Sequence, residues 1–153
     1  MIDELEFRKS WSFFPTGVSV LAVKNKDDNF HGMTASSIMS ISLKPPIIMV
    51  SVGLERTILD HLESADFFSV SLLTKKQENV ALSFSKSNNQ NKSFFSSKED
   101  IFFIDDCLGY FFCVKHKSLR VGDHMVYFLE VENMEFYIKD PLVWYKGNFE
   151  NIL

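Results

Sequence analysis

Short runs of apolar or alternating residues recur along this chain, and turn-forming residues separate them. Residues 38–43, 47–52 and 67–73 are runs of this kind, with Pro45-Pro46 and Gly53 between them. Runs this short, rich in β-branched and aromatic residues, are typical of strands. They do not follow the strand–helix–strand rhythm of a parallel sheet. The pattern therefore predicts a mainly β fold, an antiparallel barrel that is closed or nearly closed, with a few short helices.

Two β-hairpins are predicted by the turn residues. Residues 18–23 and an extended run that opens at Phe30 flank a polar turn at 24–29. Residues 110–116 and 125–134 flank Gly122-Asp123 and predict a second, longer hairpin.

Three short helices are also indicated. Apolar residues among the charges of residues 2–12 predict an amphipathic helix that lies over the start of the sheet. Thr57 and Thr74 are each followed three residues later by an acidic or amide side chain, a capping-box pattern that predicts a helix start near each. Residues 83–100, rich in Ser, Asn and Lys, are predicted to be a long loop anchored by phenylalanines.

Length and charge limit the domain count and the classes of partner. With 153 residues, 46% of them hydrophobic, the chain suits one domain over residues 1–153 and is too short for two. The net charge of −4 argues against nucleic acid or anionic lipid as a partner, since both need a basic face. Residues 1–6 are acidic and no apolar run approaches the roughly 20 residues of a spanning helix, so we expect a cytoplasmic protein without membrane contact.

The two cysteines, Cys107 and Cys113, match no paired-thiol motif. If residues 110–114 form one strand with Cys107 at its entry, a rise of about 3.3 Å per residue holds the sulfurs too far apart to bridge. We expect two free thiols.

Small hydroxyl residues cluster at residues 31–37, which end in Thr34-Ala35-Ser36-Ser37. Small side chains bury little surface in an ordinary strand and leave space beside it, which a ligand could fill. A flat heteroaromatic ring with many hydrogen-bond acceptors, such as a flavin, suits backbone N–H groups and short hydroxyls. The alternative is an edge strand whose serines face solvent.

A phosphate seat is suggested further along, where Ser51 and Gly53 lead into Arg56-Thr57 and a predicted helix. An arginine pairs bidentately with phosphate oxygens, and a helix N-terminus adds free N–H groups. The alternative is that Thr57 only caps the helix and Arg56 is a solvated surface charge.

Together these stretches resemble the flavin-reductase-like family, the small components of two-component flavin monooxygenases. The matching stretches are Phe14-Pro15-Thr16-Gly17-Val18-Ser19-Val20, residues 31–37, Ser40-Ile41-Ser42-Leu43-Lys44-Pro45-Pro46, Arg56-Thr57, Gly122-Asp123-His124, Pro141-Leu142 and Tyr145-Lys146-Gly147. The likeness spans nearly the whole chain, and the combination is more specific than any one tripeptide.

The resemblance implies a split-barrel homodimer that binds FMN or FAD and reduces it with NADH or NADPH, supplying reduced flavin to a separate monooxygenase. Few arginines are present, which favours NADH slightly. Carried over by position, Thr34, Ala35, Ser36 and Ser37 would line the isoalloxazine and ribityl chain, Ser51, Arg56 and Thr57 the phosphate, and Phe84 a wall, while His124 would face the nicotinamide. Lys92 and Phe94 match the family's loop only loosely.

Four other interpretations remain. A non-catalytic flavin binder on the same barrel would act as a store, a sensor or a docking domain. Related split barrels that oxidise pyridoxamine phosphate or bind haem share the fold, but lack the Thr-Ala-Ser-Ser and Gly-Asp-His combination. A metal site would need His31, His116, His124 and Asp123 to converge, although their spacing follows no ligand pattern. A serine hydrolase would need a nucleophile elbow, and this sequence has none.

Overall fold

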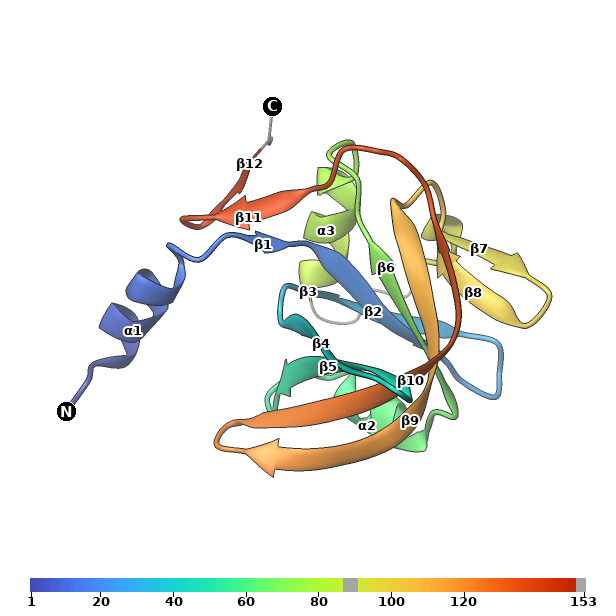
Figure 1. Cartoon of the computed structure of the whole chain (residues 1–153), viewed down its shortest axis with the longest axis horizontal. Coiled ribbons are helices and arrows are strands. Elements are labelled where there is room, and N and C mark those ends of the chain that lie inside the picture. Colours follow the sequence, from blue (N-terminus) through green and yellow to red (C-terminus); the bar gives the residue numbers. More distant parts are fainter. Residues whose placement is uncertain (87–90, 151–153) are drawn as a thin grey trace.

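The mainly β fold is confirmed by a computed structural model, which describes residues 1–86 and 91–150 (Figure 1). The strands are β1 (Thr16–Gly17), β2 (Ser19–Lys24), β3 (Phe30–Ala35), β4 (Ile38–Leu43), β5 (Pro46–Gly53), β6 (Phe67–Leu72), β7 (Phe95–Lys98), β8 (Ile101–Ile104), β9 (Gly109–Val121), β10 (His124–Phe136), β11 (Val143–Tyr145) and β12 (Asn148–Glu150). The helices are α1 (Glu4–Trp11), α2 (Leu59–Ser64), α3 (Glu78–Ser85) and the 3₁₀ turn η1 (Lys92–Phe94).

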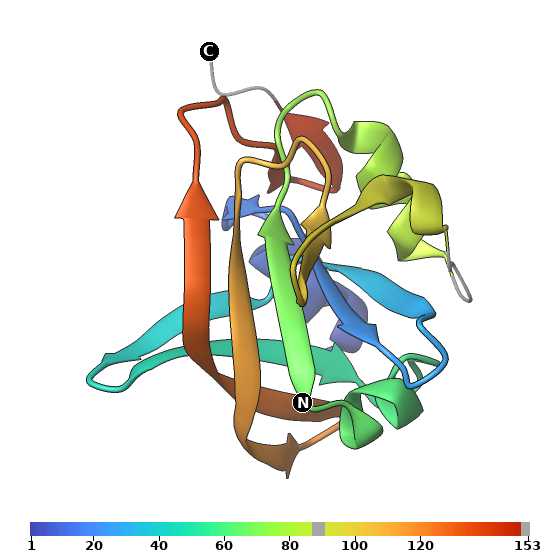
Figure 2. The same cartoon turned by 90° about the vertical axis from the view of Figure 1, so that its right-hand side faces the viewer.

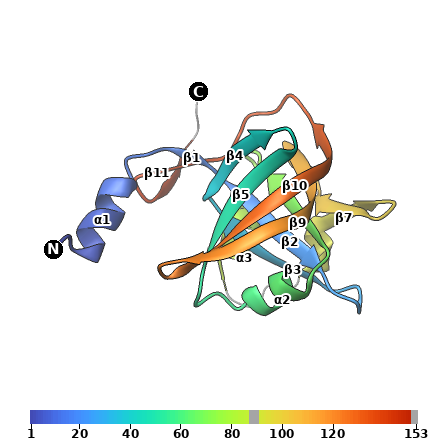
Figure 3. The same cartoon turned by 60° about the horizontal axis from the view of Figure 1, so that its bottom comes forward.

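Seven strands form one antiparallel sheet in the order β3-β2-β6-β9-β10-β5-β4. Its two edge strands, β3 and β4, are consecutive in the chain, and only Ser36 and Ser37 separate them. The sheet must therefore curl until the end of β3 lies close to the start of β4. Figure 3 shows the curled sheet. No β3–β4 pairing occurs among the described strands, so the barrel is split at this seam.

Both predicted hairpins are confirmed. β2 pairs with β3 across the polar turn, and β9 pairs with β10. The second hairpin is longer than predicted, because strand pairing continues through the polar residues up to Val121 and His124. Gly122 adopts a φ of +58° between them, a left-handed conformation that favours glycine.

The predicted loop at residues 83–100 is only partly correct. α3 extends to Ser85, η1 follows, and β7 pairs with β8, which the sequence pattern did not reveal. Residues 87–90 of the predicted loop lie outside the described residues. The hairpin forms because Phe102 and Ile104 on β8 are buried in the core and Phe95 on β7 packs against the same cluster, while Ser97 and Lys98 are exposed.

Two hydrophobic clusters lie on opposite faces of the sheet, and β2 contributes to both. Val20 and Ala22 belong to the cluster beneath α3 and the β7–β8 hairpin, whereas Leu21 and Val23 belong to the cluster inside the curl. Side chains alternate between the two faces of a strand, so a strand between two cores must be apolar throughout. This explains why residues 18–23 are almost uniformly apolar.

α1 forms as predicted, but it does not lie over the sheet. Asp3 caps it by accepting a hydrogen bond from the backbone N–H of Glu6 at 3.1 Å. None of its residues is buried, and the helix projects from the body of the molecule (Figures 1 and 3). Its apolar stripe predicted the helix correctly but could not determine what covers that stripe.

α2 and α3 begin later than the capping-box pattern predicts. α2 starts at Leu59 with Ile58 at its N-cap and no side-chain cap, so the Thr57 capping box is not formed. α3 starts at Glu78, and Thr74 donates its backbone N–H to Oε1 of Gln77 at 3.0 Å. Only half of that box is present, and it stabilises a turn before the helix.

Both thiols are free and buried, as expected. Cys107 belongs to one hydrophobic cluster and Cys113 to the other, so they lie on different faces of the sheet. Burial raises the pKa of Cys107 to about 11 and that of Cys113 to about 12. In the described ranges, every helix is too short or too polar to cross a bilayer.

Candidate functional site

The hydroxyl run lies at the end of β3, and its first members are tied to the protein itself. Thr34 donates its hydroxyl to the backbone carbonyl of Ala81 on α3 at 2.6 Å. Ala35 is buried in the core, and its carbonyl accepts a hydrogen bond from the Ser19 hydroxyl at 2.7 Å. The Thr34 hydroxyl therefore offers a ligand only its lone pairs, while the buried Ala35 lies beneath it.

Ser36 and Ser37 cross the seam of the barrel and are exposed. Ser37 is joined to β5 twice: its hydroxyl donates to the Ser51 carbonyl at 2.7 Å, and its own carbonyl accepts from the Ser51 N–H at 3.3 Å. The structure thus brings Ser51 beside the hydroxyl run, as the flavin hypothesis requires. The Ser36 hydroxyl makes no such hydrogen bond to the described residues, and Ser36 borders two pockets.

One of these pockets brings together three of the predicted residues. It is a cavity of about 200 Å³ bordered by Thr34, Ser36 and Arg56. The remaining lining consists of Val18, Ala81, Leu82, Ser85, Trp144 and Phe149. A pocket with mostly apolar walls, a few hydroxyl groups and one guanidinium group suits a ligand that joins an aromatic ring to an anionic group. The other pocket, about 250 Å³, runs from Ser36 along Thr16, Gly17 and Ser19.

Arg56 has a guanidinium group that is only weakly engaged. Its Nε lies 3.5 Å from Oε1 of Glu55, and the side chain is 47% exposed. Thr57 is also exposed, next to it. Because α2 begins at Leu59 and has only six residues, helix-dipole support for an anion here is weak, and the charge of Arg56 remains the main attraction.

His124 lies beside the end of β5, next to the loop that carries Arg56. It pairs in register with Gly53, and Leu54 donates its N–H to the Asp123 carbonyl at 2.9 Å. The His124 Nδ1 lies 2.8 Å from Asp123 Oδ1, and this contact lowers the pKa of Asp123. The neighbouring carboxylate thus orients the imidazole ring through Nδ1. His124 does not border the pocket that contains Arg56.

Phe84 does not occupy the position predicted for it. Its ring is 1% exposed and lies in the core against Phe94 and Phe95, with centroid distances of 5.8 and 5.7 Å. Phe84 lies on the buried face of α3, in the same hydrophobic cluster as Ala81, and it does not line the pocket.

The histidines of the metal alternative lie apart. His31 stacks on His61 with ring centroids 3.4 Å apart, His116 pairs with Glu130, and His124 pairs with Asp123. Within residues 1–86 and 91–150, no group of three or more His, Cys, Asp or Glu side chains could hold a metal ion.

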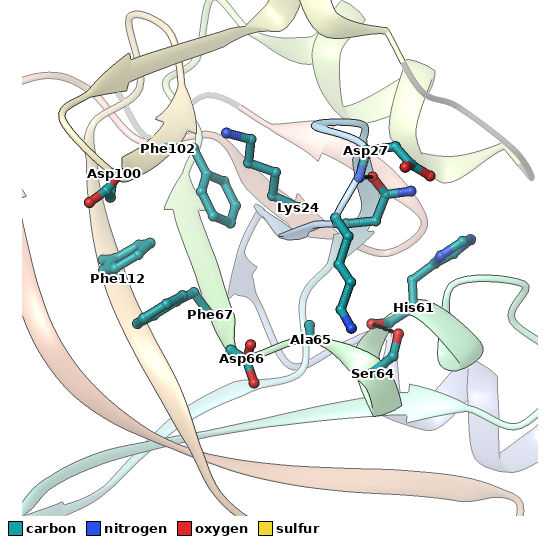
Figure 4. A pocket seen from close by; sticks show the side chains of 12 residues that line it. Lys24, Asp27, His61, Ser64, Ala65, Asp66, Phe67, Asp100, Phe102 and Phe112 are labelled. Atoms are coloured by element: carbon teal, nitrogen blue, oxygen red, sulfur yellow. Dashed lines mark hydrogen bonds between the residues drawn. The ribbon is translucent and has the colours of Figure 1, made fainter.

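A wider pocket of about 800 Å³ lies elsewhere, near the β2–β3 turn and α2 (Figure 4). Phe67 and Phe112 stack at one side of it, and His61 and Ser64 lie across from them. None of the predicted site residues lines it.

Sequence reasoning missed two aromatic residues that border the Arg56 pocket. Trp144 and Phe149 lie on β11 and β12, and the two-residue turn between these strands has positive φ at both Lys146 and Gly147. A Lys-Gly pair between short apolar runs is a signal for such a turn, and it would have indicated a terminal hairpin.

Comparison with known proteins identifies the family of this chain. The model of the family described as "Flavin reductase like domain" matches residues 11–153. An NADH-dependent flavin reductase from a Rhodococcus species is 27% identical, over 99% of this chain and 88% of that protein. The reductase component of 4-hydroxyphenylacetate 3-monooxygenase from Thermus thermophilus is 28% identical, over 96% and 95% respectively.

A solved structure gives the same result. The NADH:FAD oxidoreductase of Streptomyces globisporus, solved in complex with NAD and FAD fragments, superimposes with a TM-score of 0.91 at 28% identity. The match covers 99% of this chain and 93% of that one. With the family model spanning nearly the whole sequence, this chain belongs to the flavin reductase-like family.

Proposed function

We propose that this protein is an NADH-dependent flavin reductase that supplies reduced flavin to a separate monooxygenase. The observation that carries the proposal is the family match over residues 11–153, together with the single pocket that gathers Thr34, Ser36 and Arg56. Relatives named as NADH-dependent flavin reductases and as monooxygenase reductase components support it.

A flavin held here, FAD or FMN, would supply the redox chemistry, with the hydride passing from C4 of the reduced nicotinamide to flavin N5. The protein mainly supplies stacking geometry and electrostatic support, because the cofactors carry the difficult chemistry. We assign Arg56, with Ser51 and Thr57 beside it, to the flavin phosphate. Backbone N–H groups of residues 34–37 are assigned to the polar edge of the ring, where negative charge develops. His124, oriented by Asp123, is assigned to the nicotinamide carboxamide or pyrophosphate.

NADH is the favoured co-substrate on electrostatic grounds. Among the described residues that line the two pockets at Ser36, Arg56 is the one with a formal positive charge. If Arg56 binds the flavin phosphate, no second cation there remains for the 2′-phosphate of NADPH.

The direct test is NADH oxidation by flavin-stripped protein, followed at 340 nm with FMN, FAD or no added flavin. A rate that requires flavin and exceeds the no-enzyme control establishes the reductase and identifies its preferred flavin. Tight flavin binding without oxidation of NADH or NADPH would instead establish the non-catalytic binder. Repeating the assay with NADPH tests the electrostatic argument.

Arg56→Ala tests the phosphate assignment. The change should raise the FMN dissociation constant by one to two decades, about 1.5–3 kcal/mol for a charge-assisted bond, and leave the riboflavin constant unchanged. Arg120→Ala is a matched control, because this guanidinium group lies on β9 and donates to the Gly122 carbonyl. An unchanged FMN constant in Arg56→Ala would remove Arg56 from the site.

We also propose a homodimer in the cytoplasm. β4 is a sheet edge that exposes Met39, Ile41 and Leu43, the last to 84%, and an exposed apolar edge invites pairing with a second copy. Light scattering on a sizing column should give twice the chain mass of 17.7 kDa. A monomer at micromolar concentration would contradict the dimer.

Two free thiols and a need for NADH favour a cytoplasmic location, which cell fractionation tests.

A further inference from the structure

The pocket that contains Arg56 is closed by residues from the far end of the chain. β11 pairs with β1, placing Trp144 opposite Thr16, and β12 returns alongside so that Phe149 lies opposite Trp144. Figures 1 and 3 both show this terminal hairpin beside β1, away from the ladder of the main sheet. The two aromatic side chains therefore reach the pocket from a sheet of their own.

This hairpin is firmly attached. Leu142, just before β11, donates its N–H to the Leu73 carbonyl at 2.9 Å and accepts from the Val18 N–H at 3.1 Å. Lys146 in the turn donates to the Ser12 carbonyl at 2.9 Å. The backbone is thus held at both ends of β11, so the positions of its side chains are fixed before any ligand binds.

The two rings form a preorganised apolar wall. Their centroids lie 5.0 Å apart at an interplanar angle of 68°, and both rings pack on the hydrophobic cluster that includes Val18 and Ala81. Leu82, 49% exposed, lines the same cavity from α3. α3 and the terminal hairpin therefore give the cavity apolar sides, and Thr34, Ser36 and the charge of Arg56 complete its lining. Figure 2 shows α3 and the terminal hairpin at the same end of the molecule.

The size of the cavity indicates which part of a flavin it takes. At about 200 Å³ it is smaller than the roughly 300–1,000 Å³ that holds a whole drug-sized ligand. It suits a ring system and cannot enclose a complete dinucleotide. Flat aromatic surfaces attract other aromatic rings through stacked or edge contacts, and indole is among the most effective.

We propose that Trp144 and Phe149 are specificity-determining residues that bind the flavin ring itself, independently of its phosphate. The inference rests on the proposed function, and it assigns two parts of the flavin, the phosphate and the ring, to different residues. Arg56 selects for the phosphate, while the aromatic wall recognises the isoalloxazine that riboflavin, FMN and FAD share.

The division predicts two distinct binding patterns. Trp144→Ala should raise the dissociation constants of riboflavin and FMN by the same factor, about tenfold. Arg56→Ala should raise that of FMN alone. Isothermal titration without NADH measures both constants at equilibrium, so a failure of wild-type protein to bind any flavin would sink the proposed function. Normal wild-type binding with unchanged constants in Trp144→Ala would overturn only the present inference.

Flavin fluorescence supplies a readout that a merely structural role would not move. An indole in van der Waals contact quenches isoalloxazine emission by electron transfer, so riboflavin bound to wild type should be dark. Trp144→Phe should restore part of the emission of the bound ligand. Trp11→Phe is the matched control, because the other tryptophan of the chain lies on α1, is 61% exposed and lines no part of the cavity.

Phe149→Leu is a second variant that should fold even if Trp144→Ala does not, because it keeps an apolar side chain in the terminal hairpin. It should weaken riboflavin and FMN binding equally but less than Trp144→Ala, while urea unfolding still shows one cooperative transition. Bound riboflavin that stays equally dark in Trp144→Phe would place the ring elsewhere and refute the aromatic wall.

Discussion

Gly32 lies on β3 where no side chain fits, so Gly32→Ala should destabilise the fold. A Cβ added there would lie 2.8 Å from Cε1 and 2.9 Å from Cδ1 of Phe84, and 3.3 Å from Cγ1 of Val20. Carbon atoms do not approach so closely without displacement. Phe84 is 1% exposed and enclosed by the rings of Phe94 and Phe95, so it has no free space into which to turn.

The expected cost is that of overpacking a tight core, about 1–3 kcal/mol. For a chain of this size each kcal/mol lowers the melting temperature by about 2–4 °C, so the fall should lie between about 2 and 12 °C. The strain arises from one pair of groups, which permits a double-mutant cycle. Gly32→Ala should cost less in a Phe84→Leu background, because the smaller side chain leaves room for the new methyl group.

Urea unfolding followed by circular dichroism measures these free energies. Gly17→Ala is the matched control, since nothing lies within 4 Å of a Cβ added at that position, and its cost should stay within about 0.5 kcal/mol. If Gly32→Ala proves as stable as Gly17→Ala, or if its cost is the same in the Phe84→Leu background, the packing argument is refuted.

Three further predictions concern a histidine pair, the thiols and the nicotinamide site. Burial, and then the charge of His61, lowers the pKa of His31. When the pH falls below about 6.5, His31 binds a proton in the unfolded chain but stays neutral in the folded chain, so the free energy of unfolding decreases. His31→Gln should therefore lose less stability than wild type between pH 7.5 and pH 5.5 in urea titrations, and an equal loss would contradict this origin. With pKa values of about 11 and 12, Cys107 and Cys113 should not react with a disulfide reagent at pH 8 until urea unfolds the protein, whereas rapid labelling of the native state would show that a thiol is accessible. His124→Asn should lower the turnover of NADH several-fold while changing the flavin dissociation constant less than twofold. If turnover and flavin affinity fall equally, the His124 imidazole contacts the flavin and not the nicotinamide.

The turn residues predicted the β2–β3 and β9–β10 hairpins correctly because turn chemistry is local. Gly122-Asp123 determines where β9 and β10 reverse, whatever else the chain does. Neither α1 nor Phe84 could be placed in this way. The apolar stripe of α1 specifies a helix but not its covering, and the aromatic character of Phe84 suits a ligand wall and a core equally well.

The site was predictable in its parts and not in its assembly. The hydroxyl run and Arg56 were recognised from residue types, and the curl of the sheet brings Thr34, Ser36 and Arg56 to one pocket. Trp144 and Phe149 were missed, because strands of three residues give almost no periodic signal. Their contribution depends on the long-range pairing of β11 with β1, which local patterns do not encode.

The pairing of β1 with β11 also affects when the site can exist during synthesis. The pocket draws on residues from Val18 to Phe149, almost the full span of the chain. At about 5–20 residues per second, on the order of ten seconds separate the emergence of these two residues from the ribosome. A nascent chain can fold much of its seven-stranded sheet in that interval, yet this pocket lacks Trp144 and Phe149 until the terminal hairpin pairs with β1. Flavin is therefore expected to act on the finished protein and not as a template for its folding.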